Sequence, residues 1–454
     1  MELAGRKVAV VGLGISNRAL IRFLLKKGAR VTGCDRKTAG DLGEAWEELS
    51  RFPLQLCLGP RYLDCLPGQE IIFVTPGMRK DLPELLEARA KGARVESEIT
   101  LFFRLCRAPI VGITGSAGKT TTTTLTGEIL RVAGLEVRVG GNIGNPLIEE
   151  VEDIPAESWV VMELSSFQLQ LLRRSPQVGA LLNLSPNHLD IHASMKEYVE
   201  AKENIFRYQG RGDTVVLNRD NPYTRRMSEM APSRVVFFSR EERVEEGACL
   251  LGDAIAWCAE GREVEVCRLG DLKLMGAHNV ENVLAVVAIT GVCGAPPGAM
   301  REVVTTFRGV PHRLELVREV AGVKFYNDSI ATTPERTIAA LRSFRQPVLL
   351  IAGGYDKRLP FEELAREAVG KVKALYTLGA TAPKIEAAVE REIKNQGIQL
   401  PVNRCRDLAE AVERSARDAR PGDVVLLSPA CASYDMFLNF EERGRAFREM
   451  VARL

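Results

Sequence analysis

The sequence lacks long apolar runs and an excess of charge of either sign. Its longest apolar runs, such as residues 347–353, are far shorter than the roughly 18 to 20 residues that span a bilayer, so we expect no transmembrane helix. The 61 Lys and Arg residues nearly balance the 59 Asp and Glu residues. This balance argues against general binding to nucleic acid or to a membrane surface, so any anionic ligand must be held by a local site.

Closely spaced cysteines are also missing, and the amino-terminal residues do not show the pattern of a cleavable leader. The ten cysteines never occur at CxxC spacing, which favours reduced, structural thiols over a zinc site. The amino terminus, MELAGRKVAVVGLG, carries Glu2 and passes directly into strand-like residues without a small-residue cleavage site. We therefore expect no signal peptide and a cytoplasmic protein.

Short β-branched runs alternate with helical stretches along nearly the whole chain, which predicts an α/β fold with largely parallel sheets. The 454 residues suggest about three domains at roughly 150 residues each. We place them at 1–97, 98–308 and 309–454, with a β-rich extension at 234–275. The expected strands are 8–11, 31–34, 71–74, 110–113, 159–162, 180–184, 215–217, 347–351 and 424–427.

A glycine-rich loop follows the first expected strand. Gly12 and Gly14 precede a helix, and Asp35 ends the next strand, a spacing similar to that of a dinucleotide-binding fingerprint. Asn17 stands where the third glycine belongs, which favours another nucleotide over NAD and leaves a purely structural turn open. Arg36 adds positive charge where a nucleotide would lie, although it could equally be a solvated surface residue.

The second glycine-rich loop, TGSAGKTT at 114–121, lies between the strand 110–113 and a helix through Leu130. Its backbone N–H groups would hold phosphates, Lys119 would reach the outer phosphates, and the Thr120 hydroxyl could ligate Mg²⁺. The strict motif has glycine where Ile113 stands, so this is a variant P-loop. The implied ligand is ATP.

Acids and a histidine follow two further strands. Glu163 ends the strand 159–162, at the edge where open α/β sheets bind ligands, and His188 and Asp190 follow the strand 180–184. Glu163 could complete the magnesium site, and neutral His188 could ligate metal. The alternatives are a helix-capping carboxylate for Glu163 and a surface loop for His188.

Lys202 occupies an apolar position. In the helix expected at about 194–208 the apolar stripe includes Met195, Tyr198 and Ile205, and Lys202 falls on that stripe. Snorkelling of the ammonium group to solvent is the interpretation that the residues alone favour. The alternative is a buried, neutral amine that captures CO₂ and becomes an anionic metal ligand, since burial can lower a lysine pKa by about 3 to 5 units.

Ten short motifs in chain order resemble the Mur ligases, the ATP-dependent peptide-bond formers of cell-wall precursor synthesis, over essentially the whole chain. The motifs are TGSAGKTT (114–121), GGNIGNP (140–146), ELSSFQL (163–169), NLSPNHLD (183–190), YVEAK (198–202), GAHNVEN (276–282), GVPHR (309–313), NDSIAT (327–332), GGYDK (353–357) and LLSPACASYDMFLNFEERG (426–444). The GLGIS loop and Asp35 favour the branch that adds D-glutamate to UDP-N-acetylmuramoyl-L-alanine.

The resemblance implies a Rossmann-like first domain for the UDP substrate, a central P-loop domain for ATP, and a Rossmann-like third domain for the amino acid. The UDP-substrate residues would be Gly14, Ile15, Ser16, Asp35, Arg36, Thr75, Pro76, Gly77, Asn142 and His188. The ATP residues would be Gly115, Ser116, Ala117, Gly118, Lys119, Thr120, Thr121, Asn279, Asn282, Arg313 and Asp328. D-glutamate would be held by Thr332, Lys357, Ser433 and Phe440.

The resemblance also implies the catalytic and metal-binding groups. Lys119, Glu163, His188 and Lys202 would be catalytic; Thr120, Glu163, His188 and a carbamylated Lys202 would arrange two Mg²⁺ ions. Two positions depart from the family pattern: Ala117 replaces an asparagine common in this loop, and Ile330 stands where many members have lysine. The expected partners are small-molecule substrates only, with no nucleic acid and no membrane span, and the chain is expected to be a monomer.

Two rival interpretations remain at this point. A Rossmann dehydrogenase is disfavoured by Asn17 and by the second phosphate loop. A nucleotide-dependent switch protein would hydrolyse ATP without needing any acceptor. Within the resemblance, the residues alone do not fix which amino acid is added.

Overall fold

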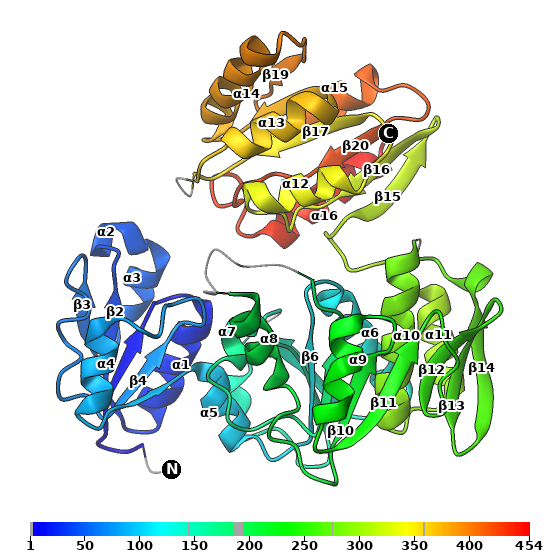
Figure 1. The fold of residues 1–454 in the computed structure, drawn as a ribbon. Coiled ribbons are helices and arrows are strands. Elements are labelled where there is room, and N and C mark those ends of the chain that lie inside the picture. The colour runs from blue at the N-terminus through cyan, green and yellow to red at the C-terminus, as the bar shows by residue number, and fades with distance from the viewer. Residues whose placement is uncertain (1–2, 144–145, 186–193, 275, 357–358) are drawn as a thin grey trace. The chain divides into compact units, whose positions relative to one another are not determined.

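The computed structural model describes residues 3–143, 146–185, 194–274, 276–356 and 359–454. The chain forms three separate sheets, coloured blue, cyan to green, and yellow to red along the chain in Figure 1. Backbone contacts divide it into two compact units, residues 1–307 and 308–454. The first two sheets belong to the first unit and the third sheet to the second, and the α/β fold class predicted from the sequence is confirmed.

The first sheet is parallel throughout, with strand order β3-β2-β1-β4-β5. The chain steps outward from β1 to β3 and then returns to the other side of β1, so the strand order reverses between β1 and β4. Its elements are β1 (Lys7–Val11), α1 (Ile15–Lys26), β2 (Arg30–Asp35), α2 (Ala39–Leu42), α3 (Glu44–Leu49), β3 (Gln55–Leu58), β4 (Ile71–Val74), α4 (Pro83–Ala90) and β5 (Arg94–Glu96).

The central sheet has nine strands in the order β14-β13-β12-β11-β10-β9-β6-β8-β7, and only the pairs β12–β13 and β13–β14 are antiparallel. Strand β6, which precedes the P-loop, lies between β8 and β9. The elements begin with α5 (Glu98–Leu105), β6 (Ile110–Thr114), α6 (Lys119–Val132), β7 (Val137–Gly141), η1 (Ile148–Glu150), β8 (Trp159–Glu163), α7 (Ser166–Leu169), β9 (Val178–Leu181) and α8 (Met195–Glu203). They continue with β10 (Thr214–Asn218), α9 (Pro222–Met227), η2 (Ser228–Met230), β11 (Arg234–Ser239), β12 (Gly247–Leu251), β13 (Ala254–Ala259), β14 (Arg262–Arg268), η3 (Leu269–Asp271), α10 (Ala277–Val292) and α11 (Pro297–Thr306).

The third sheet has the order β15-β16-β20-β17-β18-β19, with β15 antiparallel to β16 and the rest parallel. Two apolar clusters built from this sheet and its helices form the core of the second unit. Its elements are β15 (Glu315–Val320), β16 (Val323–Asn327), α12 (Pro334–Arg342), β17 (Val348–Gly353), α13 (Glu362–Lys371), β18 (Val372–Leu378), α14 (Ala382–Gln396), β19 (Val402–Arg404), α15 (Leu408–Asp418), β20 (Val424–Leu427) and α16 (Phe440–Ala452).

Two element predictions from the sequence were wrong at their ends. The strand expected at 180–184 is β9, which ends at Leu181, because Asn183 turns to bond the P-loop: its carbonyl accepts from the Ser116 N–H at 3.0 Å. The helix expected at 194–208 is α8, which ends at Glu203, after which bonds such as Phe206 N–H to the Glu203 carbonyl tighten the chain into turns. The β-rich extension at 234–275 is present as β11 to β14.

No helix in the described part of the chain is long and apolar enough to cross a membrane.

Candidate active site

The P-loop sits at the carboxyl end of β6, where the motif predicted it. Gly118 has φ +84°, and a Cβ at this position would lie 2.2 Å from Oδ1 of Asn282, so α10 approaches the loop closely. Asn279 accepts a hydrogen bond from the Asn282 amide at 3.2 Å. The structure therefore brings Asn279 and Asn282, both predicted from sequence, to the loop that would hold the phosphates.

Glu163, at the end of β8, connects the start of α6 with the end of β7. Its carboxylate accepts a hydrogen bond from the Thr120 hydroxyl at 2.8 Å and another from the Asn142 amide at 2.9 Å. Gly141 makes this junction possible, since it has φ +94° and a Cβ there would lie 2.3 Å from the Glu163 carbonyl oxygen. A capping carboxylate, the alternative interpretation, does not describe these contacts.

The sequence-based preference for a snorkelling Lys202 was wrong. Its side chain is only 1% exposed, and its Nζ donates to the Thr114 hydroxyl at 3.0 Å and to the Gly115 carbonyl at 3.1 Å. Burial holds the pKa of this amine well below its ordinary value; nearby Lys119 lowers the pKa further and Glu163 opposes the shift. Lys119 donates to the same Gly115 carbonyl, and Glu163 lies beside Ile113 in the strand register, so the P-loop lysine, the acid and the buried amine gather at the end of β6.

Two contacts that sequence reasoning missed hold the P-loop in shape. Asn183 accepts a hydrogen bond from the Ala117 N–H at 2.9 Å, and the Tyr198 hydroxyl lies 2.9 Å from the Ser116 hydroxyl. Both side chains belong to motifs that carried the resemblance, so their presence was visible but their role was not. Lys119 folds back in this state and donates to the Gly115 carbonyl at 3.0 Å.

The oxygen donors present fit Mg²⁺. Thr120 and Glu163 offer a hydroxyl and a carboxylate at one point, the donor types that Mg²⁺ prefers. No group of three or more His, Cys, Asp or Glu side chains gathers as a metal site among the described residues. His188, the further predicted metal ligand, lies outside the described residues.

The loops at the carboxyl end of the first sheet also come together. Asp35 accepts a hydrogen bond from the Leu13 N–H at 2.8 Å, and a Cβ on Gly12 would lie 3.0 Å from the Thr75 side chain. The predicted residues Gly14, Ile15 and Ser16 therefore share this edge with Asp35 and the turn Thr75, Pro76 and Gly77. It is the edge where the strand order reverses, the usual ligand position in open α/β sheets.

Asn17 explains the missing glycine of the first loop. The side chain is 4% exposed, and its amide donates to the carbonyls of Val11 at 3.0 Å and Gly12 at 2.7 Å. The amide thus secures the loop directly, where a dinucleotide fingerprint would use close packing of a glycine. Ile15 at the start of α1 is 64% exposed and faces solvent.

In the second unit, loops after β16, β17 and β20 meet. Asp328 accepts hydrogen bonds from the Ser428 hydroxyl at 2.8 Å and from the Leu314 N–H at 3.2 Å, and burial raises its pKa to about 6. Tyr355 N–H donates to the Ala432 carbonyl at 2.9 Å, which brings the GGYDK loop to the same edge. Lys357 of that loop lies outside the described residues.

Arg443 ties these loops together and was not predicted. Its buried guanidinium donates to the hydroxyl and carbonyl oxygens of Ser329 at 3.0 and 2.9 Å and to the carbonyls of Ala432 and Cys431 at 3.2 and 3.1 Å. The Ser329 hydroxyl in turn donates to the Phe440 carbonyl at 2.8 Å. The loops that carry Thr332, Ser433 and Phe440 are thereby fixed at one edge, while Arg313 nearby is exposed.

Next to the substituted position Ile330, the exposed Arg336 donates a hydrogen bond to the Ile330 carbonyl at 3.1 Å. A cation is therefore present beside the position where the resemblance leads us to expect lysine.

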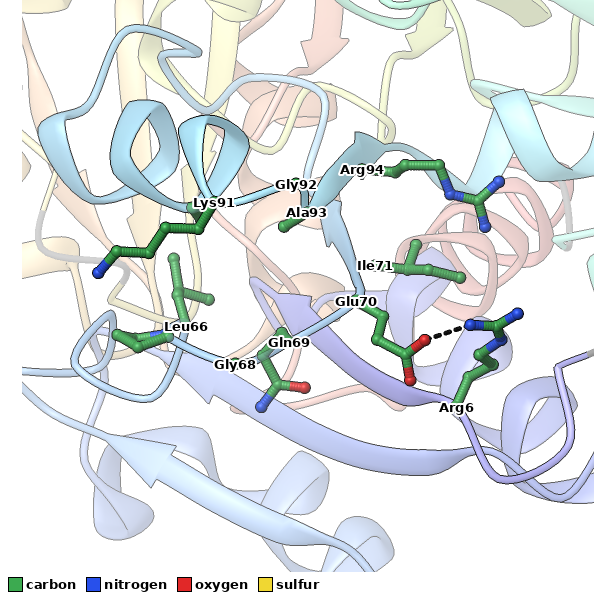
Figure 2. Close-up of a pocket in the computed structure, with 12 residues that line it drawn as sticks. Arg6, Leu66, Gly68, Gln69, Glu70, Ile71, Lys91, Gly92, Ala93 and Arg94 are labelled. Carbon is green, nitrogen blue, oxygen red and sulfur yellow. Dashed lines mark hydrogen bonds and ion pairs between the residues drawn. The ribbon is translucent and has the colours of Figure 1, made fainter.

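A pocket of about 780 Å³ lies at the opposite end of the first sheet, lined by residues that include Arg6, Gln69, Glu70 and Arg94. Figure 2 shows Arg6 and Glu70 as an ion pair at one side of it. None of its lining residues is a predicted site residue, and it opens at the amino ends of the strands. The ligand edge inferred above is at the carboxyl ends.

Three family models match the chain in order: the Mur ligase MurD-like N-terminal domain over residues 6–97, the Mur ligase middle domain over 113–290, and the Mur ligase glutamate ligase domain over 312–431. Together they cover most of the sequence. The chain belongs to the Mur ligase family. The resemblance stated from the motifs is confirmed, and neither a dehydrogenase nor a switch protein agrees with this membership.

Curated relatives match this Mur ligase over nearly its whole length. A protein of Symbiobacterium thermophilum is 54% identical over 450 residues, covering 99% of this chain and 98% of the relative. One of Clostridium novyi is 50% identical over 452 residues, covering 100% and 98%. Both relatives are named UDP-N-acetylmuramoylalanine–D-glutamate ligase.

Solved Mur ligases share its fold. The UDP-N-acetylmuramate–alanine ligase of Thermotoga maritima aligns with a TM-score of 0.55 at 20% identity, covering 98% of this chain and 99% of that one. The MurF ligase of the same organism, in complex with ADP, aligns at 0.52 and 18% identity, covering 100% and 97%.

Proposed function

We propose that this enzyme joins D-glutamate to UDP-N-acetylmuramoyl-L-alanine at the expense of ATP, as a step in peptidoglycan precursor synthesis. The proposal is supported by relatives of that name that are about half identical over the full chain. The geometric observation that carries it is the meeting of Lys119, Thr120, Glu163 and Lys202 at the carboxyl ends of β6 and β8.

The reaction needs an activated acyl group. The alanyl carboxylate attacks the γ-phosphorus of ATP to give an acyl phosphate and ADP, and the amine of D-glutamate then attacks the acyl carbon and expels phosphate. Charge on the phosphates is neutralised by the backbone N–H groups of residues 115–121 and by the Lys119 ammonium. The same groups hold the γ-phosphate in line with the attacking carboxylate. Mg²⁺ bound by Thr120 and Glu163 would supply further electrostatic stabilisation of the transferred phosphoryl group.

Lys202 is proposed to be carbamylated. Its buried amine, held neutral by its lowered pKa, can add CO₂ with loss of one proton and become an anionic oxygen ligand. Together with Glu163, Thr120 and His188 it would arrange two Mg²⁺ ions. The nearby Lys119 cation would stabilise the carbamate charge, because the same electrostatic interaction that disfavours the Lys202 ammonium favours an anion.

The remaining predicted residues divide between three substrates. Gly14, Ile15, Ser16, Asp35, Arg36 and the 75–77 turn would hold the UDP portion; Asn142 and His188 would hold the sugar and lactoyl-alanine end. Asn279, Asn282, Arg313 and Asp328 would contact the nucleotide of ATP. Thr332, Lys357, Ser433 and Phe440 would hold D-glutamate. The corresponding domains are 1–97, 98–308 and 309–454.

An ADP-release assay tests this function. We expect ADP only when UDP-N-acetylmuramoyl-L-alanine and D-glutamate are both supplied with Mg·ATP. The same assay with L-glutamate, L-alanine, L-lysine and meso-diaminopimelate fixes the amino-acid specificity. ADP release without an acceptor would contradict a ligase, and equal use of another amino acid would contradict the D-glutamate assignment.

Lys202→Ala tests the carbamate. We expect it to lose activity and to recover part of it with bicarbonate or short carboxylic acids, which can supply the missing carboxylate. Lys196→Ala, an exposed lysine on the same helix α8, is the matched control and should retain activity. Full activity of Lys202→Ala without any additive would refute the carbamate.

A further inference from the structure

Three cysteines of the first sheet gather beside Asp35. Cys34 on β2 and Cys57 on β3 are neighbours in the strand register, and Cys65 lies in the turns that follow β3. The Cys34 and Cys65 sulfur atoms are 3.1 Å apart. The scattered positions of these residues in the sequence gave no sign of the cluster.

The thiol in this cluster that is both accessible and acidic is that of Cys65. Cys34 is buried, whereas Cys57 and Cys65 are partly exposed. The hydrogen bond with Cys34 lowers the pKa of Cys65 to about 6 and raises that of Cys34. Burial and a hydrogen bond with Cys65 raise the pKa of Cys57 to about 11. Near neutral pH the reactive thiolate form therefore belongs to Cys65.

We propose that Cys65 is a peroxide-reactive thiol and that Cys34 resolves it into a Cys34–Cys65 disulfide. The Cys65 thiolate attacks one oxygen of a hydroperoxide such as H₂O₂, the O–O bond breaks, and the hydroxide that leaves takes up a proton to form water. The Cys34 thiol then attacks the sulfenic sulfur, and a second water leaves as the S–S bond forms. The two thiols lose two electrons, which reduce the peroxide.

The disulfide would act on the neighbouring loop. Bonding requires the sulfurs to approach from 3.1 Å to about 2.05 Å. Cys34 lies directly before Asp35, whose carboxylate accepts the Leu13 N–H. The Cys34 carbonyl accepts the Gly12 N–H at 2.8 Å. A shift of Cys34 therefore moves the edge assigned above to the UDP substrate, and this consequence rests on the proposed function.

The chain contains a matched control pair. The Cys249 and Cys258 sulfurs are 3.6 Å apart on the antiparallel strands β12 and β13, at similar proximity to the first pair. Both residues are buried, and burial raises the pKa of Cys258 to about 12. Proximity alone would predict oxidation of both pairs, whereas exposure and thiolate character predict oxidation of Cys65 only.

The test treats the reduced full chain with graded H₂O₂ at pH 7, blocks free thiols and maps peptides by mass spectrometry. We expect a Cys34–Cys65 cross-link to form at least about tenfold faster than any product at Cys249 or Cys258. Cys65→Ser should abolish the cross-link, and the Cys34→Ser, Cys57→Ser double variant should leave a Cys65 sulfenic acid that dimedone labels. A Cys57–Cys65 cross-link, or equal oxidation of the buried pair, would overturn the proposal.

A second arm tests the consequence. The KM for the UDP substrate should rise at least about fivefold after oxidation and return with dithiothreitol, while Cys65→Ser stays at the reduced value under peroxide. An unchanged KM in cross-linked protein would overturn the effect on the UDP edge and leave the modification standing. A reduced enzyme without ligase activity would refute the proposed function instead, since the cross-link is read by mass.

Discussion

Arg443 shows how much one buried side chain can fix in this enzyme. It is 1% exposed, and its four hydrogen bonds join Ser329 to the carbonyls of Cys431 and Ala432. A planar guanidinium supplies these donors in a fixed fork, which a lysine cannot reproduce. Arg443 is thus a positioning residue for the loops that carry Thr332 and Ser433.

Arg443→Lys should therefore loosen the amino-acid end of the site specifically. We expect the KM for D-glutamate to rise about tenfold, equivalent to about 1.4 kcal/mol, with the KM for the UDP substrate unchanged. Steady-state kinetics with each substrate varied in turn provide the measurement. Arg445→Lys, an exposed arginine on the same helix, should behave as the parent. A uniform loss of kcat with both KM values unchanged would contradict the positioning role.

Glu98 at the start of α5 provides a pH-dependent prediction. The side chain is 7% exposed, and burial raises its pKa to about 7. The pKa of this carboxyl in the folded protein lies above its unfolded value of about 4.3. The stability that the protonated carboxyl contributes is therefore fully present below a pH of about 4.3 and is lost as the pH rises through about 7.

Glu98→Gln should remove this dependence. Relative to the parent, the variant should gain up to about 4 kcal/mol in the free energy of unfolding at pH 8 and little at pH 4.5. Urea titrations followed by circular dichroism at the two pH values measure the difference. The exposed Glu157→Gln should match the parent at both; a pH-independent effect of Glu98→Gln would rule out titration as its cause.

The sequence predicted single residues best where a motif has a physical meaning. Lys119 was predicted because a phosphate-binding loop needs a lysine at that position. Glu163 was predicted because ligands bind at the carboxyl ends of strands in open α/β sheets. The sequence placed Lys202 on the apolar face of its helix but did not predict that its amine is buried. Helical spacing shows which face of a helix a residue occupies and not how deeply that face is buried. Arg443 and the thiol cluster depend on contacts between distant segments, and those contacts leave no local pattern.

Strands β7 and β8 meet at a glycine beside the site. Gly141 at the end of β7 combines φ +94° with a space that a Cβ would fill 2.3 Å from the backbone oxygen of Glu163. Gly92 has nearly the same φ, +93°, with no atom within 4 Å of that Cβ position. Substituting Gly92 therefore tests backbone strain alone, whereas substituting Gly141 adds a steric collision to the same strain.

Gly92→Ala should cost only the strain of a left-handed alanine, about 1 kcal/mol, and keep full activity. Gly141→Ala must also push the Glu163 backbone away, so we expect at least about a hundredfold loss of kcat, equivalent to about 2.7 kcal/mol. Thermal melts and the ADP-release assay on both variants make the comparison. Equal behaviour of the two variants would show that the close approach to Glu163 carries no function.

Element order was predictable because β-branched runs and helical stretches alternate so regularly. The end of β9 was not, since the Asn183 contacts that draw the chain from the sheet are made with a loop 66 residues earlier. The end of α8 failed for a related reason: the apolar stripe continues through Ile205 and Phe206, but the backbone tightens after Glu203 while those side chains stay buried. An apolar pattern alone does not distinguish a helix from a series of turns.

The two units of the whole chain differ in how they build their cores. In residues 308–454 two apolar clusters are complete within the unit. In the first unit one cluster joins side chains around the first sheet, such as Phe23 of α1, to Phe102 of α5 and Ile148 of η1 in the central part. Salt bridges from Arg22 to Glu149 and from Lys27 to Glu152 connect the same parts.

A fragment of residues 308–454 should therefore fold alone, because about 150 residues with a complete core bury roughly 68 to 70% of their unfolded surface. We expect a cooperative thermal transition and a dispersed NMR spectrum. A fragment of residues 1–97 should aggregate, or melt at least about 10 °C below the fragment 308–454. Cutting the chain at residue 97 exposes Phe23 and its neighbours to water. The fragment 1–307 keeps that cluster intact and should fold, yet release no ADP with Mg·ATP, the UDP substrate and D-glutamate, because Arg313, Asp328 and the residues assigned to D-glutamate are absent from it. If residues 1–97 proved as stable as 308–454, the shared cluster would contribute little, and the first sheet would be an independent domain.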